Sequence, residues 1–149
     1  MGITIRRMEI RDIDKVLKIE GESFPSPWGK ENFLYELMFN RFSHYFVAEE
    51  DGEVVGYIGA WIFLDETHIV TIATRGDRRG RGIGKKLLEE ILKLSREMGA
   101  RRAFLEVREG NEIARRFYEK HGFKVYGKRF KYYRDTGEDA ILMEKDLSE

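Results

Sequence analysis

The sequence predicts a mixed α/β domain in which one central sheet carries helices on both faces. Segments rich in β-branched and aromatic residues alternate with segments whose apolar residues recur every three or four positions. Helix-capping and turn residues separate the two kinds of segment at short intervals. In order, the segments follow the pattern βααβββαβαββ, with about seven strands and no internal repeat or low-complexity tract. We therefore expect residues 1–149 to form a single domain.

The first half of the chain supplies a strand, two helices and a β-hairpin. The bend between the helices, residues 24–28, contains both prolines of the chain and should be stiff. Asp51-Gly52 predicts a two-residue turn. Gly56 and Gly59, in the strand after it, predict a bulge or a close backbone approach. The expected elements are a strand beginning at Ile3, a helix that Asp12 caps, a short helix containing Phe33 and Met38, and strands at His44–Glu49 and Glu53–Phe63.

The second half alternates strands with helices. Gly99 and Gly122 should end the two helices, because glycine readily takes the left-handed conformation at a helix C-terminus. Asn111 should cap the second of these helices. The expected elements are a strand at 69–74, a helix from Gly82 to Met98, a strand at Ala103–Val107, a helix between Asn111 and Gly122, and a final hairpin of Phe123–Tyr133 and Ala140–Glu144.

The turn before the long helix, residues 78–88, is rich in glycine and arginine. Glycines let the backbone approach a ligand closely, and the free N–H groups of a helix N-terminus attract anions, so we predict a pyrophosphate site here. Two other phosphate motifs fit poorly. A P-loop requires glycine where Arg79 stands and serine or threonine where Lys86 stands, and a dinucleotide fingerprint requires glycine at Lys85. Taken alone, the segment is also compatible with a glycine-rich turn that has a solvated basic rim.

The composition narrows the classes of function. The 27 basic and 27 acidic residues balance, which argues against bulk binding of nucleic acid. Cysteine is absent, so disulfides and cysteine-based metal sites are excluded, and we expect no metal. No apolar run reaches membrane-spanning length and no secretory segment is recognisable, so we expect a cytoplasmic protein without a membrane partner. The 36% of charged residues and the absence of glutamine are typical of heat-adapted proteins.

Several separated motifs together resemble one family, the GNAT superfamily of N-acetyltransferases. The resemblance spans nearly the whole chain, and the motifs occur in the family's order. Within the family, the bend and the tail resemble the RimI-type and archaeal N-terminal protein acetyltransferases. The motifs are Arg79-x-x-Gly82-x-Gly84, Leu105–Arg108, Asn111, Ala114, Tyr118–Lys120, Gly122-Phe123, the tail Tyr132-Tyr133 with Gly137–Ala140 and Met143, and the bend Phe24-Pro25 with Trp28, Lys30 and Phe33.

This resemblance implies the GNAT fold and acetyl-CoA as cosubstrate. The family holds the cofactor in a cleft where the fourth and fifth strands splay apart, and a splayed strand offers free backbone groups to an amide-bearing cofactor. By resemblance, the pantetheine arm pairs with the backbone of Ile72, Ala73 and Thr74, and Asn111 holds one of its amides. The pyrophosphate is expected on backbone amides of Arg79, Gly80, Arg81, Gly82, Ile83, Gly84 and Lys85.

Acetyl transfer to an amine requires a base for the amine and a proton for the departing thiolate. Glu106, a carboxylate in an otherwise apolar strand, matches the catalytic glutamate of the RimI-type enzymes; an outward-facing charge is the alternative. Tyr118 lies seven residues after Asn111, so both share one helix face, and it matches the family's general acid, also placed at the cofactor sulfur. His68 is a second candidate base, which we consider less suitable because a strand-end histidine commonly contacts solvent. Archaeal relatives use a glutamate in the bend, but Ser26 stands at that position.

The acceptor site is expected between the bend and the final hairpin. Phe24, Pro25, Tyr132 and Tyr133 are the candidates, since aromatic side chains can wall a small pocket. The resemblance implies transfer to the α-amine of protein or peptide N-termini, ribosomal proteins among them, by a monomer or weak homodimer. Two other functions remain open: acetylation of a small-molecule amine on the same fold, and a CoA-binding sensor domain without turnover.

Overall fold

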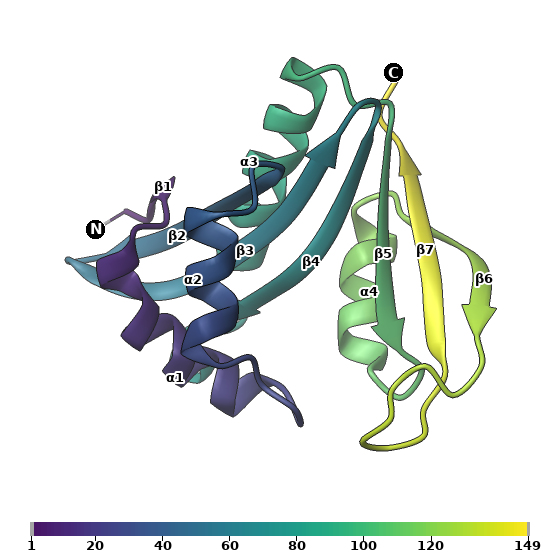
Figure 1. The fold of residues 1–149 in the computed structure, drawn as a ribbon, viewed down its shortest axis with the longest axis horizontal. Helices are drawn as coiled ribbons and strands as arrows, with labels where there is room; N and C mark the ends of the chain where they lie inside the picture. Colours follow the sequence, from purple (N-terminus) through teal and green to yellow (C-terminus); the bar gives the residue numbers. More distant parts are fainter. Residues whose placement is uncertain (1, 149) are drawn as a thin grey trace.

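The computed structural model describes residues 2–148 and contains one seven-stranded sheet (Figure 1). Its strands and α-helices occur in the predicted order. No helix within residues 2–148 is long and apolar enough to cross a membrane. The elements are β1 (Thr4–Arg7), α1 (Ile13–Ser23), α2 (Lys30–Met38), β2 (Ser43–Glu50), β3 (Glu53–Phe63), β4 (Glu66–Thr74), α3 (Ile83–Glu97), β5 (Arg102–Arg108), α4 (Glu112–Lys120), β6 (Lys124–Arg129) and β7 (Ala140–Asp146), with 3-10 turns η1 (Ile10–Asp12) and η2 (Gly76–Arg78).

The strands lie in the order β1-β2-β3-β4-β5-β7-β6, so β7 inserts between β5 and β6. All neighbouring pairs are antiparallel except β4 and β5, which run parallel. The parallel pairing covers only Glu66–His68 against Arg102–Phe104. Beyond His68 the two strands diverge, as Figure 1 shows. The expected splay of the fourth and fifth strands is therefore present.

Two glycines in β3 coincide with irregularities, as predicted. Gly59 pairs with Thr71 while its neighbour Ala60 pairs with Ile69, which leaves Val70 of β4 as the extra residue of a bulge. A Cβ on Gly59 would overlap the ring of Tyr45. Only glycine therefore leaves room for the Tyr45 ring to lie across β3 at this position.

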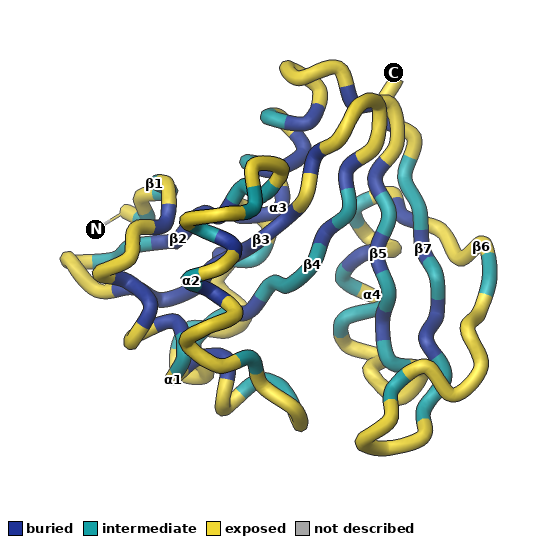
Figure 2. Tube along the Cα trace, viewed as in Figure 1, coloured by how far each residue is buried: buried dark blue, intermediate teal, exposed yellow. Residues whose placement is uncertain are grey.

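The sheet buries one apolar cluster on each face. α1 and α2 cover the front of β2, β3 and β4, while α3 and α4 cover the back (Figures 1 and 2). The apolar stripe of α3 supplies Leu87, Leu88 and Ile91, all fully buried, and each such side chain contributes about 1.5 to 3 kcal/mol. This packing makes the sheet a rigid support for residues at its centre.

The last hairpin is shorter than predicted. β6 ends at Arg129, which pairs with Ala140, and residues 130–139 form a loop. Lys131 has a positive φ of 47° and donates its backbone N–H to Asp139 Oδ1 at 2.8 Å, which turns the chain out of the sheet. The prediction of a strand extending to Tyr133 was wrong, because hydrogen bonds to Asp139 and Asp135 from residues distant in the chain replace the ladder here.

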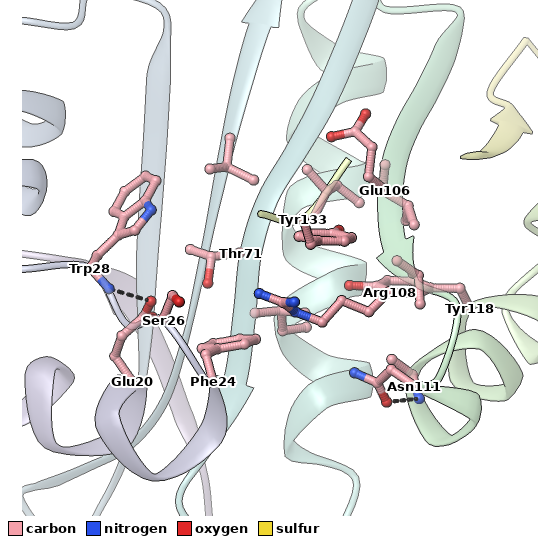
Figure 3. Close-up of a pocket in the computed structure, with 16 residues that line it drawn as sticks. Glu20, Phe24, Ser26, Trp28, Thr71, Glu106, Arg108, Asn111, Tyr118 and Tyr133 are labelled. Carbon is pink, nitrogen blue, oxygen red and sulfur yellow. Dashed lines mark hydrogen bonds between the residues drawn. The ribbon is translucent and has the colours of Figure 1, made fainter. Parts of the chain in front are cut away.

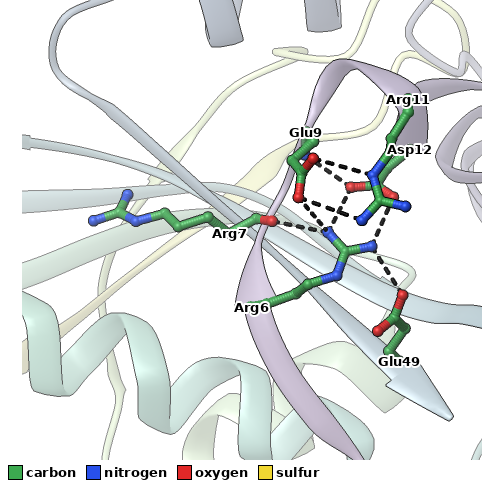
Figure 4. Close-up of polar contacts among 6 residues, drawn as sticks. All are labelled: Arg6, Arg7, Glu9, Arg11, Asp12 and Glu49. Atoms are coloured by element: carbon green, nitrogen blue, oxygen red, sulfur yellow. Dashed lines mark hydrogen bonds and ion pairs between the residues drawn. The ribbon is translucent and has the colours of Figure 1, made fainter. Parts of the chain in front are cut away.

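A polar cluster fastens the N-terminal strand to the sheet (Figure 4). The Arg6 guanidinium donates to Asp12 at 2.8 and 2.9 Å and to Glu49 at 2.9 Å. Burial would raise the pKa of Asp12, but the hydrogen bonds from Arg6 and from the Glu9 backbone outweigh it and lower that pKa. Asp12 occupies the N-cap position of α1, yet its side chain makes no cap bond. The expected capping role was therefore wrong, because these partners occupy the carboxylate.

Candidate active site

A cavity of about 250 Å³ lies where β4 and β5 diverge (Figure 3). Its walls come from β4, β5, the bend between α1 and α2, the start of α4, and the loop between β6 and β7. Segments distant in sequence therefore meet at one point of the fold. The side chains that they contribute include carboxylates, a guanidinium, an amide and two phenols.

The β5-facing edge of β4 is free along one wall of this cavity. Past His68, no strand among the described residues pairs with that edge. Ile72 lines the cavity, and Ala73 and Thr74 continue the same edge toward the turn before α3. Unpaired backbone groups require hydrogen-bond partners, so an extended, amide-bearing chain can pair here.

The turn before α3 leaves its backbone amides free. Gly80 and Gly82 both have φ of 81°, the left-handed region that glycine adopts without strain. The first bond within the helix runs from Lys86 N–H to Gly82 O, so the preceding N–H groups of the first turn have no intrahelical acceptor. No atom lies within 4 Å of a Cβ built on either of these two glycines. The turn is therefore an open anion-binding geometry at the positive end of a helix.

Two arginines of this turn, Arg78 and Arg79, make contacts within the fold. Arg79 donates to Thr74 O at 3.1 Å and to Ser23 Oγ at 3.2 Å, and so ties the end of β4 to α1. Arg78 pairs with Glu50 at 2.7 Å. An anion in the turn would therefore meet the free backbone amides and the exposed Arg81 side chain rather than Arg78 or Arg79.

Glu106 faces the cavity from β5, because its neighbours Leu105 and Val107 point to the buried opposite face. His68 Nε2 lies 3.0 Å from both carboxylate oxygens of Glu106. The His68 side chain is 35% exposed, so it contacts solvent as expected, and it also packs edge-on against Trp61, with ring centroids 5.7 Å apart. Both residues could be chosen as candidates from the sequence, but their pairing depends on the β4–β5 register, which no local pattern reveals.

Tyr118 and Asn111 both line the cavity from α4, so they share a helix face as predicted. Asn111 Oδ1 accepts the backbone N–H of Ala114 at 3.1 Å, which confirms the predicted cap. Tyr118 is only 5% exposed, and this burial, with Tyr133 nearby, raises the pKa of its phenol well above the usual value. The phenol therefore stays protonated and available as a hydrogen-bond donor.

Glu20 is a cavity residue that sequence reasoning missed. It is 3% exposed, accepts the backbone N–H of Trp28 at 3.0 Å, and accepts the hydroxyl of Tyr57. Burial raises the pKa of Glu20 despite these hydrogen bonds. The sequence did contain a signal: Glu20 lies four residues after Val16, which places a carboxylate on the apolar face of α1.

The four expected acceptor residues separate into two groups. Phe24 and Tyr133 line the cavity, whereas Pro25 and Tyr132 are exposed and lie outside its lining. Tyr132 lies outside the cavity because residues 130–139 form a loop rather than the predicted strand. Trp28 of the bend packs edge-on against Phe33 and also lines the cavity.

A polar link joins the two loops over the cavity. Asp135 accepts two hydrogen bonds from Arg108, at 2.8 and 2.9 Å, and one from Ser26 at 2.6 Å. These bonds, those of Arg108 first, lower the pKa of Asp135 far below its usual range. The Arg108 guanidinium also stacks 4.0 Å above the Tyr133 ring. Ser26 thus holds the bend to the loop.

Comparison with known proteins places this chain. Residues 13–123 match the model of the acetyltransferase (GNAT) family, so the chain belongs to that family. It is 43% identical, over 97% of its length and 96% of the relative's, to a Bacillus subtilis protein provisionally named a ribosomal-protein-bS18-alanine N-acetyltransferase. It is 37% identical to an N-alpha-acetyltransferase of Sulfurisphaera tokodaii, covering 96% of this chain and 92% of that one. The crystal structure of the Escherichia coli ribosomal-protein-S18-alanine N-acetyltransferase superposes with a TM-score of 0.90 at 29% identity, covering 99% and 96% of the two chains.

Proposed function

We propose that this protein transfers the acetyl group of acetyl-CoA to the free N-terminal α-amine of proteins. The observation that carries the proposal is the convergence of Glu106 and Tyr118 on one cavity that also exposes the free edge of β4. Membership of the GNAT family supports acetyl-CoA as the cosubstrate. The names of the relatives support an α-amine, and those of the Bacillus and Escherichia proteins make ribosomal protein N-termini candidate acceptors.

The cofactor fits the free backbone groups described above. The open amides of the turn from Arg79 to Lys85 would hold the pyrophosphate. The edge at Ile72, Ala73 and Thr74 would pair with the pantetheine amides, with Asn111 opposite. This arrangement would direct the thioester into the cavity between Glu106 and Tyr118.

The reaction we propose is direct attack in a ternary complex, since the chain has no cysteine to form a cysteinyl acyl-enzyme. The amine nitrogen bonds to the thioester carbonyl carbon as the carbon–sulfur bond breaks. Glu106, with His68 bonded to it, takes the amine proton directly or through one water. Tyr118 donates a proton or a strong hydrogen bond to the departing sulfur. Because burial makes this phenol a weaker acid than free tyrosine, we favour the hydrogen bond.

An α-amine suits this site better than a lysine side chain. An α-amine has a pKa of about 8 and a lysine about 10.4, so a lysine begins roughly 3 kcal/mol less favourably at neutral pH. Phe24, Trp28 and Tyr133 leave a small space for the first side chain. The link from Ser26 to Asp135 narrows access for an amine presented from the middle of a chain.

The test is acetylation of a peptide library in which every peptide has a free N-terminus and an internal lysine. With acetyl-CoA, we expect the label on the α-amine, with strong dependence on the first one or two residues. The same peptides with blocked N-termini serve as the control and should remain unlabelled. Mass spectrometry that places the acetyl group chiefly on lysine, or on polyamines instead of peptides, would exclude this function.

A further inference from the structure

The front face of the sheet, which carries α1 and α2, is covered over only half its width (Figure 1). The residues of α4 pack into the core behind β5 and β7, on the opposite face. Within residues 2–148, no helix covers the front of β5, β7 and β6. Solvent therefore reaches the front of these strands above the loop that holds Tyr133.

Four aromatic rings occupy this uncovered face, and we call them the aromatic platform: Trp61, His68, Phe104 and Tyr126. The sheet register places Trp61 opposite His68, and His68 opposite Phe104. Phe104 meets Tyr126 edge-on, with ring centroids 6.0 Å apart. Trp61 is 37% exposed and Tyr126 is 50% exposed, so the rings at both ends of the platform are open to solvent. Glu144 of β7 lies opposite Phe104 and pairs with Arg102 at 2.9 Å, so a charged pair borders the platform.

The platform is held rigidly. Trp61 Nε1 donates to Glu36 Oε1 at 2.6 Å, and Glu36 is a buried carboxylate on α2. The register of β6 skips a residue between Val125 and Gly127, and this bulge turns Tyr126 toward Phe104. A surface whose rings are already fixed loses little entropy when a chain binds to it.

The platform is continuous with the cavity at Glu106. Phe104, Glu106 and Arg108 alternate along β5 and share the front face. At the Arg108 end, Asp135 and Ser26 join the two loops across the cavity. The Phe104 end is open, because no such link crosses it among the described residues. A chain whose first residue lies at Glu106 therefore has its free path over Phe104.

We propose that the aromatic platform binds the acceptor polypeptide beyond its acetylated residue and selects an apolar or aromatic side chain there. This inference rests on the proposed α-amine acetylation. Alternate residues of β5 are roughly 7 Å apart, and the rings of Phe104 and Tyr126 are a further 6.0 Å apart. An extended chain advances about 3.3 Å per residue, so its third to fifth residues reach Phe104 and Tyr126.

The experiment compares three peptides that share their first three residues: the tripeptide, an octapeptide with phenylalanine at position five, and the same octapeptide with serine there. For the unaltered protein, the phenylalanine octapeptide should have a KM about tenfold lower than the other two, with kcat unchanged. Phe104→Thr and Tyr126→Thr keep β-forming residues and should remove this advantage while leaving tripeptide kinetics unchanged. Val125→Thr, on the opposite face of β6, is the matched control and should keep it.

Equal KM values for the two octapeptides would overturn the inference, and this arm needs no variant to fold. Retention of the advantage in both folded variants would overturn it as well. Light scattering tests whether a second copy of the chain occupies the platform instead. If the protein is a dimer that Phe104→Thr converts to a monomer, the platform is a dimer interface and the inference is wrong. Failure of the proposed function gives a different result, because none of the three peptides would then be acetylated on its α-amine.

Discussion

Replacing Gly82 by alanine tests the proposed pyrophosphate site most directly. Gly82 has φ of 81°, and an added Cβ would meet no atom within 4 Å. The stability cost is therefore backbone strain alone, about 1 to 2 kcal/mol for an L-residue in the left-handed region. Alanine also restricts the unfolded chain, which stabilises the folded state by about 0.4 to 1 kcal/mol. The free energy of unfolding should therefore fall by about 1 kcal/mol.

The effect on binding should be larger than the effect on folding. The new methyl group would stand where the pyrophosphate oxygens approach the free amides of the turn. Loss of one hydrogen bond to a charged group costs about 1.5 to 3 kcal/mol. We therefore expect the dissociation constant for CoA to rise roughly 10- to 100-fold in Gly82→Ala.

Gly52 provides a matched control, because it has φ of 80° and equally open surroundings in the hairpin between β2 and β3. Gly52→Ala and Gly82→Ala should lose similar unfolding free energy in urea titrations. Isothermal calorimetry should show weakened CoA binding only in Gly82→Ala. Normal CoA affinity in that variant, or equal weakening in both, would refute the placement of the pyrophosphate.

Three other predictions concern catalysis, the acceptor and acid stability. Glu106→Gln should lower kcat by roughly 100-fold or more, with CoA affinity unchanged in calorimetry. Tyr118→Phe should lower kcat with little change in peptide KM. Tyr133→Ala should raise the peptide KM more than Tyr132→Ala, since only Tyr133 lines the cavity, and equal effects would contradict this. Folding lowers the pKa of Asp12, so its carboxylate stabilises the fold above the unfolded pKa of about 3.9. This contribution disappears as pH falls through the folded pKa. The loss of unfolding free energy in Asp12→Asn, measured by urea unfolding, should therefore become smaller on acidification.

The order of elements followed from the sequence because periodicity and turn residues are local signals. Asp51-Gly52, Asn111 and Gly122 each act within a few residues of their own position, and each boundary that they predicted is present. The end of β6 was misplaced because Asp139 and Asp135 bind groups that lie eight or more residues away. Their hydrogen bonds depend on the folded loop and leave no mark on the local pattern.

The cavity residues also divide into those that the sequence identified and those that depend on tertiary packing. Glu106 and Tyr118 could be chosen from the sequence because each belongs to a motif that the family shares. Glu20 and the contact of His68 with Glu106 could not, since both arise from tertiary packing between distant segments. Glu20 lies on the apolar stripe of α1, where a carboxylate is costly unless the fold supplies partners. A charged residue on such a stripe therefore deserves a functional hypothesis of its own.

The short pairing between β4 and β5 links the fold to the proposed chemistry. Three residue pairs join these strands, and the last is His68 with Phe104. Glu106 lies two residues past that pair, where the strands have begun to part, yet near enough for its carboxylate to reach the His68 imidazole at 3.0 Å. Further pairing would close the edge at Ile72 that the cofactor requires, while earlier divergence would separate the carboxylate from the imidazole. The point of divergence therefore sets both the room for the proposed cofactor and the position of the proposed base.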